Sequence, residues 1–299
     1  MNYLHRTADE LLSDLLDAFG AVLIEGPKWC GKTTTAEQQA RSVIKMQDPD
    51  MQEEYLITAN SKPSLLLQGD TPRLIDEWQD APVLWDAVRT MVDKRDEPGQ
   101  FILTGSNSVD KGKTKHSGTG RIVKMKMLPM SLWESQESTG EVSIAELFNN
   151  PNYDIDGKKS TITVESLIFA ACRGGWPAAL KSKSESAKLL IAQNYLNSVC
   201  SEDISRVDKI RRNENLAKQI LRSYARNIST IAKKTSMLED VVASQNMSCS
   251  MDTFDDYVAA LEKLFVIQDI DAWSPAIRSK TAIRSAPTVS YTHLRLPTN

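Results

Sequence analysis

The sequence predicts an α/β protein in which a parallel sheet with flanking helices is followed by a mainly helical region. Short apolar segments recur through the first half of the chain and alternate with helix-like stretches. Strands that alternate with helices form parallel sheets covered on both faces. Beyond residue 160, apolar residues recur at three- to four-residue spacing, which indicates helices. We therefore expect two domains, residues 1–150 and residues 160–288.

The elements of the first half follow from apolar spacing and from the residues that end each element. Apolar residues between Leu4 and Phe19 predict an amphipathic helix that Gly20 ends. Residues 32–40 resemble a helix, and Pro82 opens another. The polar, basic residues 108–120 predict a mobile loop. The predicted strands are residues 21–26, 43–46, 73–77, 101–105 and 121–127.

The second half follows a segment rich in Asn, Pro, Gly and charge, residues 149–159, which we interpret as a linker. A helix, a short helix, a second helix and a strand then follow one another over residues 216–270, an order typical of a winged helix–turn–helix. The predicted helices are residues 164–172, 187–199, 216–228, 229–236 and 251–264, and the strand is residues 265–270.

The composition excludes several classes of protein. Apolar residues make up 41% and charged residues 25%, as in a globular protein. No apolar run approaches the roughly 20 residues of a membrane helix, and acidic residues interrupt the N-terminal segment where a signal peptide would be apolar. The four cysteines lie far apart and there are three histidines, which disfavours a zinc site or a disulfide framework. We expect a reduced, cytoplasmic protein with no membrane partner.

The net charge of −3 hides two unlike halves. Residues 1–150 hold 16 basic and 23 acidic side chains, whereas residues 151–288 hold 19 and 16. This asymmetry is expected when two domains have different partners. The steepest basic excess comprises Arg206, Lys209, Arg211, Arg212, Lys218, Arg222, Arg226, Lys233 and Lys234.

One motif carries specific chemistry. Residues 26–33, GPKWCGKT, fit the pattern G-x-x-x-x-G-K-[ST] and lie between an apolar strand and a helix. Glycines let the main chain wrap a triphosphate, Lys32 would neutralise its β- and γ-phosphates, and Thr33 would bind Mg²⁺. The sequence thus predicts ATP and Mg²⁺ as ligands. The predicted nucleotide-binding residues of this loop are Gly26, Pro27, Lys28, Trp29, Cys30, Gly31, Lys32, Thr33 and Thr34; the Cys30 side chain is expected to point away.

A second apolar strand ends in two carboxylates, Asp76 and Glu77. Asp76 is expected to hold the magnesium shell, and Glu77 to activate water for attack on the γ-phosphate as general base. The alternative is that Glu77 is a solvated residue at a strand end. A kinase would have little use for a carboxylate that activates water.

Residues after the next strand could complete the site. One of Thr104, Ser106 and Asn107 could hydrogen-bond the attacking water or the γ-phosphate, although each could equally cap the strand. Arg121 follows the basic loop, and its guanidinium could reach the γ-phosphate of its own or a neighbouring subunit. A lone arginine on a strand is more often a surface residue. An arginine that acts between subunits would require a homo-oligomer.

These motifs, taken in order, resemble a group of prokaryotic AAA-superfamily ATP-binding proteins. The series is GPKWCGKTT at residues 26–34, RLIDEWQDAPVLWDAVR at 73–89, FILTGSNS at 101–108, then SGTGRI and LPMSLWES. The resemblance implies a phosphate loop, a magnesium-binding strand and a sensor strand, which supports catalytic roles for Lys32 and Glu77 and metal binding by Thr33 and Asp76. Residues 171–177, 200–208 and 222–237 resemble the C-terminal domain of unknown function that accompanies this ATPase.

Three expectations concern the C-terminal half. The basic stretch of residues 206–234 could bind DNA, or its lysines and arginines could be an ordinary solvated surface. Residues 289–299, VSYTHLRLPTN, resemble a translated sequencing adapter, so we expect a non-native tail and a truncated domain. The alternative is a frayed native terminus.

The sequence thus favours a Mg²⁺-dependent ATPase that couples nucleotide binding and hydrolysis to a winged-helix domain. The alternative is a non-hydrolysing, nucleotide-gated module that binds DNA or protein. A phosphotransferase is disfavoured because residues 108–120 lack the arginines of a lid.

Overall fold

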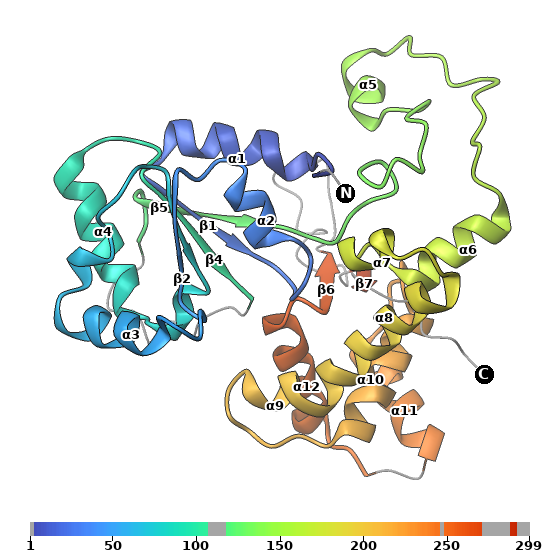
Figure 1. Cartoon of the computed structure of the whole chain (residues 1–299). Helices are drawn as coiled ribbons and strands as arrows, with labels where there is room; N and C mark the ends of the chain where they lie inside the picture. Colours follow the sequence, from blue (N-terminus) through green and yellow to red (C-terminus); the bar gives the residue numbers. More distant parts are fainter. Residues whose placement is uncertain (1–2, 107–117, 246–247, 271–287, 292–299) are drawn as a thin grey trace, which may run out of the picture.

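A computed structural model describes residues 3–106, 118–245, 248–270 and 288–291 of the 299-residue chain. Figure 1 shows an α/β unit beside a helical unit. The chain that connects the two units loops away from both and contains the short helix α5 (Ile144–Asn149). Residues 107–117, which include Asn107 and most of the loop predicted to be mobile, lie outside the described residues. Among those described, no helix is long and apolar enough to cross a membrane.

The α/β unit is built on a five-stranded parallel sheet, which confirms the predicted fold class for this half. The strand order is β2-β3-β4-β1-β5, and every neighbouring pair is parallel. The carboxyl ends of all five strands therefore meet at one edge of the sheet. The strands are β1 (Ala21–Glu25), β2 (Ser42–Lys45), β3 (Arg73–Asp76), β4 (Phe101–Gly105) and β5 (Ile122–Lys126).

Helices lie on both faces of the sheet (Figure 1), and neighbouring residues of β1 belong to opposite hydrophobic clusters. On one face, Val22 and Ile24 share a buried cluster with α1 (Thr7–Ala18) and α2 (Lys32–Glu37). On the other face, Leu23 packs with α3 (Gln52–Ser61) and α4 (Val83–Arg95), beside short 3₁₀ turns at Pro63–Leu65 and Trp78–Asp80. Burial on both faces explains why β1, β3 and β4 are short apolar runs, whereas the edge strands β2 and β5 keep exposed positions.

The helical unit follows the connecting segment that contains α5. Side-chain oxygens of Thr163, Ser184, Asn213 and Ser250 cap the starts of α6, α8, α10 and α12, as expected for these residue types. The helices are α6 (Val164–Arg173), α7 (Pro177–Lys181), α8 (Glu185–Ser198), a π-helical turn (Val199–Asp203), α9 (Ile204–Arg206), α10 (Glu214–Arg226), α11 (Lys234–Gln245) and α12 (Met251–Lys263).

The short helix predicted at residues 229–236 is wrong. Ser229 has φ of 58°, in the left-handed region, and Ile231 is exposed. Helix α11 begins only at Lys234. Its buried face includes Met237 and Val241, which are four residues apart. The Ser223 hydroxyl of α10 donates to the Met237 carbonyl and fixes the two helices together.

The last two strands pair with each other. β6 (Ile267–Ile270) and β7 (Thr288–Tyr291) are antiparallel. β7 extends into the segment predicted as a tail, and residues 292–299 lie outside the described part of the chain.

The two units share one hydrophobic core. The cluster on the α1 face of the sheet continues through Met125 and Met127 into Trp176 and Tyr195 of the helical unit. At this junction Gly175 lies against Met130, whose backbone N–H donates to the Gly175 carbonyl at 2.8 Å. The helical unit is therefore held against the edge of the sheet at which the strands end.

Candidate nucleotide-binding site

The predicted phosphate loop connects β1 to α2 at the carboxyl edge of the sheet. Gly31 has φ of 104°, a conformation that glycine adopts without strain. A Cβ added to Gly26 would lie 2.1 Å from the Met127 carbonyl oxygen, so the loop passes too close to the end of β5 for any side chain there. Glycine is thus required at position 31 by the backbone conformation and at position 26 by packing, in addition to any need for a ligand to approach the main chain.

Lys32 is folded into the loop. Its ammonium group donates to the Gly26 and Pro27 carbonyl oxygens at 3.0 and 2.9 Å, and the residue is 5% exposed. These carbonyls satisfy a buried positive charge that would otherwise be costly. The same ammonium group lines the cavity described below, so an anion in the loop would meet it directly.

Two hydroxyls converge on Asp76 from neighbouring elements. The Thr33 hydroxyl donates to Asp76 Oδ1 at 2.6 Å, and the Thr104 hydroxyl donates to the same oxygen at 2.5 Å. Thr33 and Asp76 therefore lie together, as their predicted role in metal binding requires. Both offer the oxygen ligands that Mg²⁺ prefers. Among the described residues, no cluster of three or more Asp, Glu, His or Cys could hold a metal ion, so this pair fits an ion that takes its other ligands from phosphates and water.

Glu77 lies one residue beyond β3 with its backbone in the left-handed region, at φ of 56°. Its N–H donates to the Thr104 hydroxyl at 3.2 Å. Its carboxylate accepts a hydrogen bond from the Ser106 hydroxyl at 2.8 Å and a short one from the Gln79 side-chain amide. The half-buried carboxylate lines the cavity and is held in a defined position, unlike a freely solvated strand-end residue. Gln79 was not predicted; its only signal is a polar side chain close behind Glu77.

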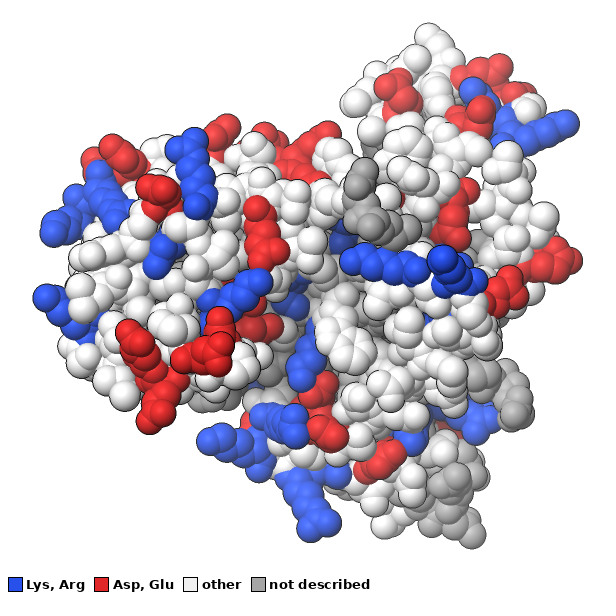
Figure 2. All heavy atoms as spheres, viewed as in Figure 1, with Lys and Arg blue, Asp and Glu red and all other residues white. Residues whose placement is uncertain are grey.

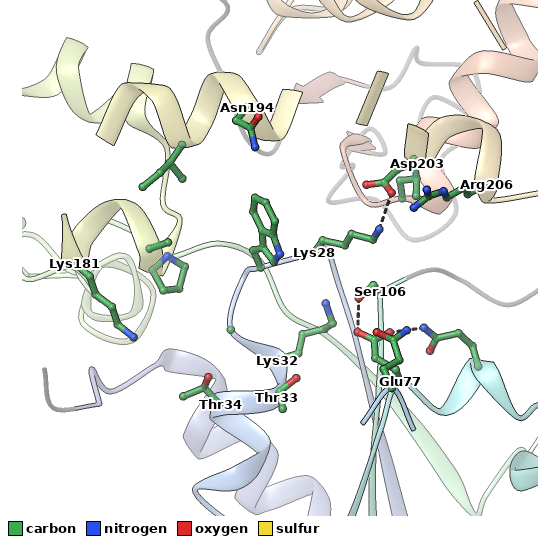
Figure 3. Close-up of a pocket in the computed structure, with 18 of the residues that line it drawn as sticks. Lys28, Lys32, Thr33, Thr34, Glu77, Ser106, Lys181, Asn194, Asp203 and Arg206 are labelled. Carbon is green, nitrogen blue, oxygen red and sulfur yellow. Dashed lines mark hydrogen bonds and ion pairs between the residues drawn. The ribbon is translucent and has the colours of Figure 1, made fainter. Parts of the chain in front are cut away.

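A cavity of about 1010 Å³ separates this edge of the sheet from the helical unit. Figure 2 shows the hollow between the two units, with charged side chains around it. Its volume is at the upper end of the range for small-molecule sites. The helical unit contributes Lys181, Asn194, Asp203 and Arg206 to its wall, as Figure 3 shows. Sequence reasoning placed none of the four at the nucleotide, because no local motif marks them; Arg206 was singled out only as part of the basic stretch of residues 206–234.

The tip of the phosphate loop contacts the helical unit. The Lys28 ammonium donates to Asp203 Oδ1 at 2.6 Å. Trp29, with φ of 64°, is 57% exposed, and its ring centroid lies 6.2 Å from that of Tyr195. Thr34 also lines the cavity. Cys30 is fully buried and its thiol faces the Met127 carbonyl; burial raises its pKa, so it is not poised to react.

The structure does not bring Arg121 to the loop of its own chain. Arg121 immediately precedes β5, and its carbonyl accepts from the N–H of Ala21, the first residue of β1. It therefore lies at the amino edge of the sheet, opposite the phosphate loop. Its guanidinium pairs with Asp93 at 2.7 Å. This corrects the expectation that Arg121 reaches a γ-phosphate within one chain. Two of the interpretations of Arg121 remain, a surface residue and a role between subunits.

The basic stretch of residues 206–234 is largely neutralised by partners within the chain. Five of its nine cations form ion pairs with carboxylates, three of which come from α11 and α12. Helix α12 itself carries four acidic residues against one lysine. The surface formed by this stretch is therefore less basic than its sequence alone suggests. The pairs are Arg206–Glu202, Arg212–Asp208, Arg212–Asp256, Lys218–Glu214, Arg226–Asp240 and Lys234–Asp255.

Comparison with solved structures gives long but weak matches. A Walker-type ATPase of Pyrococcus abyssi is 14% identical, with 90% of this chain and 92% of that chain covered, at a TM-score of 0.49. The Aeropyrum pernix ORC1 protein, solved in complex with DNA, is 13% identical over 99% and 91%, at 0.32. A RuvB variant of Thermotoga maritima is 15% identical over 93% and 93%, at 0.36.

Comparison with protein families covers most of the chain in two parts. Residues 18–136 match the family described as AAA domain, and residues 164–292 match the Domain of unknown function (DUF8612). No curated protein matches the chain. The first match contains the phosphate loop, β3 and β4, and the second contains the helices that form the other wall of the cavity. The chain therefore combines an AAA domain of the P-loop type with a C-terminal domain of unknown function.

Proposed function

We propose that this protein is a Mg²⁺-dependent ATPase that couples ATP binding and hydrolysis to its C-terminal domain. One observation carries the proposal. Lys32, the Thr33–Asp76 pair and Glu77 lie at the edge of a single cavity, and the opposite wall of that cavity belongs to the other domain. A ligand in this cavity would contact both domains, so hydrolysis of ATP there would change contacts to both domains.

Binding requires a local rearrangement of the loop. Lys32 would exchange the Gly26 and Pro27 carbonyls for the β- and γ-phosphates, a stronger partner for an ammonium group. Thr33 and Asp76 would hold Mg²⁺, which when bound neutralises charge on the phosphates. Thr104 would keep its hydrogen bond to Asp76 and so maintain the orientation of that carboxylate.

Glu77 would act as the general base. It would accept the proton of a water molecule as the water oxygen attacks the γ-phosphorus and the bond to the β,γ-bridging oxygen breaks. Ser106 and Gln79 occupy its two carboxylate oxygens, so at least one of these hydrogen bonds must yield for a water to be engaged. A slow or partner-stimulated turnover is the expected consequence.

The alternative is a nucleotide-gated module that does not hydrolyse ATP. The position of Glu77 favours hydrolysis over this alternative. For the C-terminal domain, the order α10, α11, α12 and the β6–β7 pair supports a winged helix–turn–helix. Its acidic α12 favours contact with protein over contact with DNA, because phosphates repel carboxylates.

Phosphate release by the purified chain in Mg²⁺ and ATP tests the proposal. Lys32→Ala should abolish both nucleotide binding and turnover, whereas Glu77→Gln should retain binding and lose turnover by at least about 100-fold. Glu53→Gln, which removes an exposed carboxylate from α3, is the matched control and should change neither. Turnover that persists in Glu77→Gln would remove Glu77 as the base. A parallel assay with duplex DNA tests whether DNA stimulates the reaction.

A further inference from the structure

One ion pair joins the phosphate loop to the C-terminal domain. The Lys28 ammonium lies 2.6 Å from Asp203 Oδ1, between residues 175 positions apart in sequence. The Lys28 side chain is 39% exposed and the Asp203 side chain only 10%. Lys28 is within the loop that would wrap a nucleotide, so its present partner is a carboxylate from the other domain.

Both ends of this ion pair are fixed by their surroundings. Asp203 ends the π-helical turn that continues α8, and π-helical turns recur at functional sites. On the loop side, Trp29 faces Tyr195, whose ring lies 4.2 Å from that of Trp176 in the shared core. The loop tip therefore rests on the helical unit through one ionic contact and one aromatic contact.

The ion pair lies at the end of the cavity that Ser106 and Glu77 line. In Figure 3 the Lys28 ammonium and Asp203 lie on the side of Ser106 and Glu77, away from Lys181. This step rests on the proposed function: if Glu77 activates water at the γ-phosphorus, the γ-phosphate lies at this end. A triphosphate would bring a second anion to Lys28, beside a carboxylate that is already mostly shielded from water.

We propose that the γ-phosphate of ATP and the carboxylate of Asp203 compete for Lys28, so that ATP, more than ADP, releases the C-terminal domain from the phosphate loop. A γ-phosphate paired with Lys28 would lie close to the Asp203 carboxylate, and the two anions would repel each other. Linkage makes the effect reciprocal: if ATP weakens the ion pair, the ion pair weakens ATP binding by the same factor. Asp203 thereby sets the preference of the site for ADP over ATP.

Equilibrium binding of ADP and of a non-hydrolysable ATP analogue, both with Mg²⁺, tests the proposal on the full chain. Asp203→Asn should tighten binding of the analogue by about three- to tenfold, between the effect of an exposed ion pair and that of typical coupling between sites. ADP binding should change by less than about twofold. Asp203→Glu retains the carboxylate. Its ratio of ATP-analogue affinity to ADP affinity should therefore be closer to that of the unmodified protein than the ratio of Asp203→Asn is.

Glu185→Gln is the matched control. It removes an exposed carboxylate at the start of α8, the helix that the Asp203 turn continues, and should leave both affinities unchanged. An Asp203→Asn protein that keeps its unfolding temperature but shows the unmodified ratio of affinities would overturn the proposal. Lys32→Ala separates this from the proposed function: a protein that still binds nucleotide after that change has its nucleotide elsewhere, and both claims then fall.

Loosening of the contact itself provides an independent readout. Hydrogen exchange at the amides of the Val199–Asp203 turn should be faster with the ATP analogue than with ADP, while the hydrophobic core shared by the two units stays protected. Asp203→Asn should show the faster exchange already without nucleotide, because the ion pair is absent. Equal exchange in all of these samples would contradict loss of the ion pair on ATP binding.

Discussion

At the scale of single residues, the site depends on one hydroxyl that sequence reasoning left among three options. Thr104 is fully buried, and its hydroxyl both donates to Asp76 and accepts from the Glu77 N–H. It therefore contacts both predicted acidic residues and is better described as a positioning residue than as a direct contact of water or phosphate. Ser106, another of the three, instead donates to the Glu77 carboxylate.

Thr104→Val tests this positioning role. Valine keeps the shape but leaves the buried Glu77 N–H without its partner, so the free energy of unfolding should fall by about 1–3 kcal/mol. The Mg²⁺ concentration for half-maximal phosphate release should rise, since Asp76 loses a hydrogen bond that orients it. Urea unfolding and Mg²⁺ titrations measure the two effects. Thr90→Val, which removes an exposed hydroxyl on α4, should change neither; an unchanged Mg²⁺ dependence in Thr104→Val would contradict the assignment.

At the scale of elements, the sequence predicted the central strands β1, β3 and β4 well because they are buried and appear as short apolar runs, and it predicted β5 from its alternating pattern. It also located the phosphate loop, where residue types and spacing are fixed by backbone needs at Gly26 and Gly31. It failed at residues 229–236, where residues 229–233 form a loop and residues 234–236 begin the longer helix α11. The C-terminal wall of the cavity was also missed, because contacts such as Lys28–Asp203 join distant segments and leave no local pattern.

Gly175 is an element boundary whose role only the structure reveals. A Cβ there would lie 2.0 Å from the Met130 carbonyl oxygen and 2.8 Å from its nitrogen, both backbone atoms that cannot simply move aside. Gly175→Ala should therefore lower the free energy of unfolding by about 1–3 kcal/mol through overpacking at the junction. Chemical denaturation measures this. Gly120→Ala meets no atom within 4 Å and reports only the cost of its positive φ; an equal or smaller loss at Gly175 would argue against steric pressure at the junction.

At the scale of the whole molecule, charge is used to hold segments together rather than to form a basic face. Arg212 is the clearest case: its side chain is 1% exposed and pairs with Asp208 at 2.7 Å and with Asp256 of α12 at 3.1 Å. It also donates to the Ile204 carbonyl at 2.7 Å. One guanidinium thus joins α9, the following loop and α12, and one of the nine cations of the basic stretch is internal.

This arrangement makes stability sensitive to acid in a definite direction. The hydrogen bond from Arg212 holds the pKa of Asp208 below its usual range. Because the folded pKa is lower than the unfolded one, the unfolded chain binds the proton more readily, so the stabilisation is present at neutral pH and is lost as pH falls through the folded pKa. Chemical denaturation at a series of pH values should therefore show a free energy of unfolding that declines through the acidic carboxyl range. Asp208→Asn should lower stability at pH 7 and flatten that decline, whereas Asp14→Asn, on the exposed side of α1, should leave the profile as it is. A decline of unchanged steepness in Asp208→Asn would show that other carboxylates control the acid response.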